Sequence, residues 1–245
     1  MRSLILLIVV ALFFVACASD PSEKLAPAGT VVATTTEGYE IEAGPGAENC
    51  AELDAVHKDL AEGRLLDAQS ALNFMLSRFS HFEEPGKRVL SFGSEAEYRT
   101  YLNNANDSVP IVPVDWCYRE LFQLKAFVRS AQEDFEEALV LLSKSSEVGP
   151  TAAAPFVERG YILNRLGRFE DARDSYERAI FLVNRYPISR PQEPMALRGL
   201  GFALIELGDL DGAETAFRRS LEIDADNRLA ESELDYIRKL RKKRR

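Results

Sequence analysis

Histidine is nearly missing from this chain of 245 residues. Only His57 and His81 occur, which excludes a zinc site with three imidazole ligands and any mechanism that needs several histidines. An excess of positive charge is also lacking: the net charge is −9, whereas a general nucleic-acid binder needs a basic surface. We therefore predict no nucleic acid among the partners. The composition, 46% hydrophobic and 28% charged, is that of an ordinary globular protein.

Recognisable catalytic and cofactor motifs are lacking as well. Residues 199–201 (Gly-Leu-Gly) begin like a phosphate-binding loop, but Leu204 stands where the third glycine would be. Cys50 and His57 lie seven residues apart, which matches no common metal-ligand spacing. We predict a protein that is not an enzyme, with no catalytic residues, no metal site and no cofactor.

The hydrophobic run Leu4–Ala16 is too short to span a bilayer, which takes about 20 residues, and it follows Arg2. This arrangement is typical of a secretory signal peptide at residues 1–16. Two cleavage patterns compete there. Ala16-Cys17-Ala18 fits ordinary signal peptidase, while Phe14-Val15-Ala16-Cys17 resembles the lipobox of bacterial lipoproteins, with Phe14 in place of the usual Leu.

We favour the lipobox, because cysteine is otherwise rare at a signal-peptide cleavage site. The resemblance implies that Cys17 is lipidated and that the protein is anchored in the bacterial cell envelope. Ala18 and Ser19 lack the Asp that retains many lipoproteins at the inner membrane, so we expect the outer membrane, facing the periplasm. Residues 17–48 are poor in large apolar side chains and are expected to form a flexible tether.

A repeat follows. Shifting the chain by 34 residues aligns Phe135 with Phe169 and Ala138 with Ala172, and the pattern recurs 41 residues later at residues 201–220. The second unit carries it most fully, in Gly160, Leu163, Gly167, Phe169, Ala172, Tyr176 and Ala179. These residues resemble the tetratricopeptide repeat, a pair of antiparallel helices. The resemblance implies an all-α superhelix (solenoid) with an irregular insert and a C-terminal capping helix.

The expected order of segments follows from this resemblance. After the signal peptide and tether come a degenerate helix pair (49–80), an atypical insert (81–115), three repeat units (119–227) and a capping helix with a basic tail (228–245). Within the insert we expect a helix over Glu95–Asn104 and an extended loop over Ser108–Pro113.

In this family, set positions of each first helix line a concave groove that binds partners. Carried over to this sequence, they give an aromatic residue in every clear unit, with amide and basic neighbours: Phe127, Tyr161, Asn164, Arg165, Arg198 and Phe202. Two interpretations stay open: the rings contact a partner peptide, or they pack against a neighbouring helix of the chain. The clamp by which some members bind acidic C-terminal tails is not predicted, because its Lys and Asn positions hold Gln123 and Phe127.

With Cys17 lipidated, Cys50 and Cys117 remain as an even pair in an oxidising compartment. They form either a disulfide or two separate buried thiols, since spacing alone does not decide. At the other end, seven of the eight residues 238–245 are basic. This tail is either a solvated helix end or a contact for an anionic surface, and nucleic acid is the least favoured of its partners.

Taken together, the sequence predicts a membrane-tethered, non-enzymatic scaffold that binds an envelope protein or peptide. The alternative is an accessory factor of a cell-wall or envelope-remodelling enzyme, with a site in the insert 81–115.

Overall fold

We describe residues 43–105 and 108–243 in a computed structural model of the chain. The predicted signal peptide, Cys17, most of the tether and the last two residues of the basic tail lie outside the described residues. The α-helices are Leu53–Ala61 (α2), Leu65–Ser77 (α3), Glu95–Asn104 (α4), Cys117–Ala131 (α5), Phe135–Val148 (α6), Ala154–Arg165 (α7), Phe169–Arg185 (α8), Glu193–Leu207 (α9), Leu210–Ile223 (α10) and Arg228–Lys243 (α11). Strands Arg88–Phe92 (β1) and Ile111–Asp115 (β2) and the 3₁₀ helices Ala47–Cys50 (η1), Arg78–Phe82 (η2) and Pro187–Gln192 (η3) complete the described chain.

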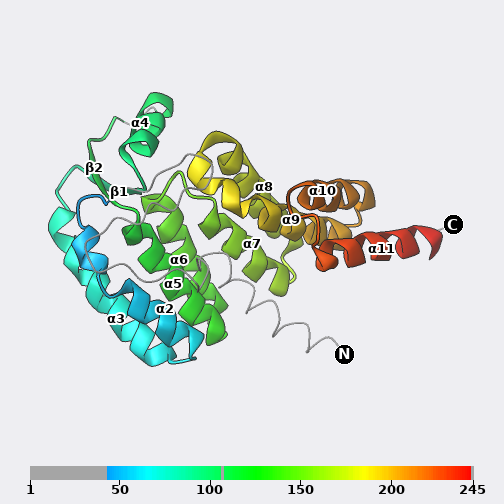
Figure 1. The fold of residues 1–245 in the computed structure, drawn as a ribbon, viewed down its shortest axis with the longest axis horizontal. Helices are drawn as coiled ribbons and strands as arrows, with labels where there is room; N and C mark the ends of the chain where they lie inside the picture. Colours follow the sequence, from blue (N-terminus) through cyan, green and yellow to red (C-terminus); the bar gives the residue numbers. More distant parts are fainter. Residues whose placement is uncertain (1–42, 106–107, 244–245) are drawn as a thin grey trace.

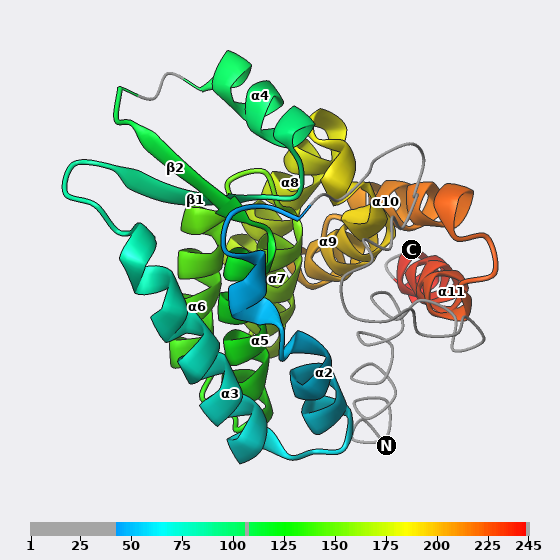
Figure 2. The ribbon, with the colours of Figure 1, turned by 60° about the vertical axis from the view of Figure 1, so that its left-hand side comes forward.

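Successive helices pair and the pairs stack into a row. In Figure 1, α2 and α3 lie beside α5 and α6 at one end, α7 with α8 and α9 with α10 follow, and α11 closes the opposite end. Figure 2 shows β1, β2 and α4 together at the end where α3 meets α5 and α6. The prediction of a mainly helical stack of paired helices is therefore confirmed.

The turn inside each helix pair is built in the same way. It holds one residue with positive φ, which is Gly63, Gly167, Gly208 or, in the α5–α6 turn, Glu133 with φ of 63°. The next residue donates its backbone N–H to a carbonyl five residues earlier, over 2.8–2.9 Å in all four turns. This is the hydrogen bond of a Schellman cap, and it reverses the chain within a few residues.

Helices approach closely, both within a pair and between adjacent pairs, where glycine faces an aromatic ring. A Cβ placed on Gly160 would lie 2.7 Å from the Tyr176 ring, and one on Gly199 would overlap the same ring. Tyr176 of α8 is therefore held against the backbones of both α7 and α9. Gly201 stands in the same relation to Phe217, at 2.6 Å. The two glycines that resembled a phosphate loop are thus packing positions inside α9.

The insert is more ordered than predicted. The helix Glu95–Asn104 is present, but the expected extended loop over Ser108–Pro113 is wrong in part, since Ile111–Asp115 forms β2. This strand pairs in parallel with β1, in a register that joins Arg88 to Ile111 and Phe92 to Asp115. Pro113 lacks an N–H and stands opposite Leu90, which a strand tolerates at the edge of a sheet.

A buried polar network holds the insert to the stack. Arg119 of α5 donates from Nη1 to Glu97 Oε1 of α4 over 3.1 Å and to the Ser91 carbonyl over 3.0 Å. Glu97 also accepts from the Gly93 backbone N–H at 2.5 Å and from the Thr151 hydroxyl. Glu97 is 3% exposed and Arg119 is 6% exposed. The pair is satisfied by several bonds, which a buried ion pair requires.

Helix α11 covers the far end of the stack. Its buried Ala230 and Ile237 pack with Ile205, Leu210 and Phe217 of α9 and α10. Near its end, Arg241 forms ion pairs with Asp211 and Glu214 of α10. Part of the basic tail is thereby bound to the protein's own acidic groups, while Lys239, Lys242 and Lys243 are exposed.

Candidate functional site

A cavity of about 90 Å³ lies between α5 and α7, the first helices of two adjacent pairs. Its lining is mostly apolar with a few polar or charged side chains, and consists of Ala126, Phe127, Ser130, Ala131, Glu158, Tyr161, Ile162 and Arg165. Glu158, Tyr161 and Arg165 are three and four residues apart, so they share one face of α7. Small-molecule pockets usually measure roughly 300–1,000 Å³, so this cavity suits a side chain better than a whole cofactor.

Three of the six predicted groove residues meet in this cavity: Phe127, Tyr161 and Arg165. The Phe127 and Tyr161 side chains are each partly buried. Arg165 is exposed, and its guanidinium lies 4.7 Å from the centre of the Phe135 ring of α6. Aromatic surface and a cation are therefore presented together on α5 and α7.

The other three lie farther along, at α7 and α9. Asn164 donates from Nδ2 to the Gly199 carbonyl over 3.3 Å, which ties α7 to α9. Arg198 pairs with Asp224 after α10 over 3.0 Å. Phe202 is 40% exposed and lies edge-on to Phe169, with 6.5 Å between ring centres. Asn164 and Arg198 thus make contacts within the chain, and Phe202 stays open to a partner.

Glu158, which the sequence analysis did not select, is the acidic member of the cavity. It accepts a hydrogen bond from the Gln123 side chain of α5. Burial, opposed by that bond and assisted by the nearby Glu120 carboxylate, raises the pKa of Glu158 to about 8. Its spacing from Tyr161 and Arg165 was the available signal, because positions i, i+3 and i+7 of a helix lie on one face.

A further polar contact joins α5 to α2. Nε2 of His57 lies 3.3 Å from Oε1 of Glu120, and the second oxygen of Glu120 is buried with no hydrogen-bond partner among the described residues. The hydrogen bond to Glu120 raises the pKa of His57, with burial acting in the opposite direction. Neither histidine forms part of a metal site: residues 43–105 and 108–243 hold no cluster of three or more His, Cys, Asp or Glu side chains suited to an ion.

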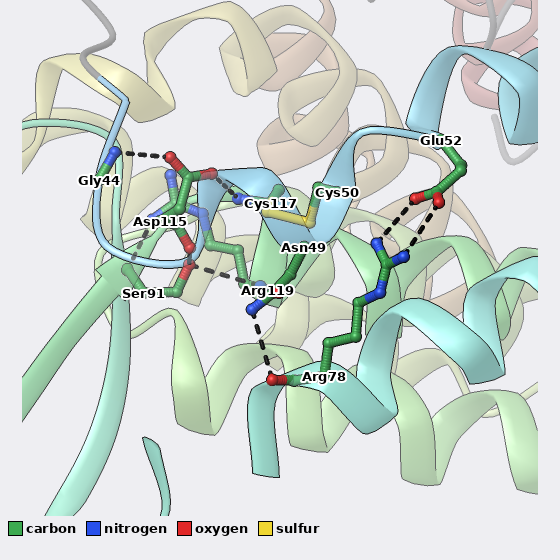
Figure 3. The surroundings of a disulfide bond; sticks show 9 residues. All are labelled: Gly44, Asn49, Cys50, Glu52, Arg78, Ser91, Asp115, Cys117 and Arg119. Carbon is green, nitrogen blue, oxygen red and sulfur yellow. Dashed lines mark hydrogen bonds and ion pairs between the residues drawn. A yellow bond between two sulfur atoms is a disulfide. The ribbon is translucent and has the colours of Figure 1, made fainter. Parts of the chain in front are cut away.

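The cysteines left open by the sequence are joined in the structure. Cys50 of η1 and Cys117 at the start of α5 form a disulfide with an S–S distance of 2.12 Å. Figure 3 shows Asp115 beside it, accepting from the backbone N–H groups of Gly44 at 2.8 Å and Cys117 at 2.9 Å. Burial raises the pKa of Asp115, against the effect of these two bonds.

On the other side of the disulfide, Arg78 donates to both carboxylate oxygens of Glu52, over 3.2 and 3.3 Å (Figure 3). Together with the disulfide, these bonds fix the chain before α2 to η2, β2 and α5. The buried charges of the insert, Glu97 and Asp115, are thus used in structural contacts.

Within the described ranges, no helix has the length and apolar character to cross a membrane.

A family model described as tetratricopeptide repeat matches residues 151–226, which include α7–α8 and α9–α10. Among curated proteins, heat shock protein STI1 of Saccharomyces cerevisiae is 28% identical over 113 residues, 46% of this chain and 18% of the yeast protein. The chain therefore spans less than a fifth of that relative's length.

Two solved structures are similar over most of the chain. A tetratricopeptide repeat protein of Parabacteroides merdae superposes with a TM-score of 0.53 at 17% identity, over 81% of this chain and 60% of that one. MamA of Desulfovibrio magneticus gives 0.52 at 14% identity, over 80% and 86%. These likenesses bear on the fold alone. We conclude that the chain contains a tetratricopeptide repeat domain, and that it folds as a helical solenoid of this type.

Proposed function

We propose that this protein is a non-enzymatic scaffold that binds a partner protein or peptide along the first helices of its repeats. Tetratricopeptide repeats are protein-interaction modules, and the yeast relative is a heat shock protein by name. The observation that carries the proposal is the cavity between α5 and α7, which presents Phe127, Tyr161 and Arg165 together. Aromatic and arginine side chains in pockets supply much of the binding energy at protein interfaces.

Mutation of the cavity tests this proposal. In intact cells, a photo-crosslinking amino acid at Ser130 should capture a partner that is identified by mass spectrometry. The double variant Phe127→Ala/Tyr161→Ala should weaken binding of that partner at least about tenfold, as expected when interface anchors are removed. Phe181→Ala on α8, where the ring is 47% exposed, is the matched control and should bind normally. Equal binding by all three proteins would refute the role of the cavity.

The membrane tether is the second part of the proposal. Its support is the apolar run Leu4–Ala16 followed by Cys17, the position at which lipoproteins carry their acyl chains. An acylated Cys17 would place the scaffold in the bacterial cell envelope, with outer-membrane sorting suggested by Ala18 and Ser19. Fixing a binding module to a surface raises the effective concentration of its partner there.

Fractionation of cells tests the tether. Cys17→Ser should move the protein from the membrane to the soluble fraction and abolish labelling with a palmitate analogue, while Cys50→Ser should keep the label. A Cys17→Ser protein that stays membrane-bound would contradict the lipid anchor. This experiment is independent of the cavity, because Cys17 lies outside the repeats.

A further inference from the structure

Resting on the proposed function, we propose that the cavity between α5 and α7 receives a positively charged side chain of the partner, a lysine or an arginine, with the Glu158 carboxylate as its counter-ion. The two aromatic side chains, Phe127 and Tyr161, line the cavity beside that carboxylate. A lysine or arginine side chain has an apolar stem, which the two rings can contact, and a charged end, which can pair with the Glu158 carboxylate. Aromatic rings also attract cations directly.

The balance of charge around Glu158 supports a cationic occupant. Among the residues that the structure describes, no cation pairs with Glu158: its partner is the neutral Gln123 amide, and the Glu120 carboxylate acts on it electrostatically. Glu120 itself has one buried oxygen without a hydrogen-bond partner in the described chain. Two partly buried carboxyl groups thus interact electrostatically, and the one base paired with them is His57, beside Glu120.

Arg165 does not neutralise this pair. It lies seven residues after Glu158, about 10 Å along the helix axis, and its guanidinium covers the Phe135 ring. The free cavity therefore holds an acidic group at its Glu158 end that an entering cation would favour in the ionised form, while Arg165 supplies a positive charge seven residues further along α7. An acidic side chain entering at Glu158 would lose water without gaining a cationic partner there, and it would disfavour ionisation of Glu158, which is costly in a partly desolvated site. The positions that could reverse this, Gln123 and Phe127, carry no positive charge.

The cavity volume supports a single side chain from a longer segment. About 90 Å³ is too small for most free ligands, and the exposed Phe202 offers a further aromatic side chain on α9. We infer an extended or helical peptide that lies along α5, α7 and α9 and inserts one basic residue. The rest of the peptide contacts the aromatic surface.

Peptide display on the full-length protein tests this inference. A random 12-residue library is selected against the wild type, and one enriched peptide is synthesised with arginine or lysine at its preferred basic position or with a neutral isostere there. Both forms are titrated against wild type, Glu158→Gln and the matched control Glu177→Gln on the exposed face of α8. Glutamine at 158 retains an oxygen for the Gln123 bond, and circular dichroism confirms that each variant is folded.

We expect selected peptides to share a basic residue, and its neutral replacement to weaken binding to the wild type about tenfold. In Glu158→Gln that tenfold difference should shrink to less than twofold, whereas Glu177→Gln should leave it intact. Acidic or uncharged consensus peptides, or an undiminished difference in Glu158→Gln, would overturn the inference. If Phe127→Ala still removed binding in those cases, the proposed function would stand. Peptides that bind without need of Phe127 would count against both.

Discussion

At the level of single residues, the stack depends on glycines that admit aromatic rings. Gly199 on α9 lies against Tyr176, which is 3% exposed and already presses on Gly160. Alanine is normally the better helix former by about 1 kcal/mol, so crowding has to exceed that gain. We expect Gly199→Ala to lower the free energy of unfolding by about 1–2 kcal/mol, measured by urea denaturation. Combining it with Tyr176→Leu should cost less than the sum of the two changes, and simple additivity would argue against the clash.

Glu133 is the exception among the four turn residues with positive φ. A non-glycine residue in this conformation carries a strain of about 1 kcal/mol. Glu133→Gly should therefore stabilise the protein by up to about 0.5 kcal/mol, the part of this strain that exceeds the cost of added flexibility in the unfolded chain. Gly167→Ala is the converse control: a Cβ there meets no atom within 4 Å, so only its φ of 72° opposes alanine. If the melting temperatures of both variants shifted in the same direction relative to the wild type, this explanation would be contradicted.

Glu158 also predicts a pH dependence of stability. Its pKa rises from 4.5 in the unfolded chain to about 8 in the fold, so the folded state binds more protons between these values. Stability from this group is present below about pH 4.5 and is lost as pH rises toward 8. In the wild type this group should lower the free energy of unfolding by about 1–2 kcal/mol between pH 5 and pH 8.5, a reduced figure because the side chain is partly solvated. Glu158→Gln should not show this decrease. Equal slopes in wild type and variant, from urea unfolding at each pH, would refute the raised pKa.

At the level of secondary-structure elements, the insert is held by the buried Glu97–Arg119 pair. Removing one partner leaves the other charge buried and unpaired, which typically costs about 3–5 kcal/mol. Glu97→Ala should lower the free energy of unfolding by at least about 3 kcal/mol and speed hydrogen exchange in β1, α4 and β2. The exposed Glu95→Ala is the control on the same helix. Unchanged exchange in the strands of Glu97→Ala would show that the pair does not hold the insert.

The repeat elements were predictable because their signals are local. Helical spacing, the glycines of the turns and the pairing of small with aromatic residues recur every 34 or so residues, as at Phe135 and Phe169. The strands were not predictable in this way, since β1 and β2 pair across α4 and Pro113 marks a loop by its own preference. The same limit applies to the site: Phe127 and Tyr161 follow from the repeat, but the charge environment of Glu158 depends on Gln123 and Glu120 of another helix.

On the scale of the whole molecule, the disulfide spans a sequence separation of 67 residues and joins the start of the described chain to α5. A loop of this length is expected to stabilise the fold by about 4 kcal/mol through the unfolded chain. Cys50→Ser/Cys117→Ser should lose that amount, with the same loss after reduction of the wild type. The double serine variant treated with the same reductant is the control, because it has no Cys50–Cys117 disulfide to reduce and any change in it comes from the reductant itself. Equal melting temperatures for oxidised and reduced wild type would contradict a stabilising role.

The two ends of the stack differ in how they are secured. The first end has a covalent bond, a sheet and a buried ion pair, while the last is closed by α11 and the ion pairs of Arg241 with Asp211 and Glu214. In a repeat stack each pair rests mainly on its neighbours, so unravelling is easiest from the less secured end. Local unfolding is therefore expected to begin at α11 and α10, which follow α5 and α7 in the chain. Fraying at the C-terminal end would leave the cavity between α5 and α7 folded, because the disulfide, the sheet and the buried ion pair all lie on the N-terminal side of that cavity or beside it.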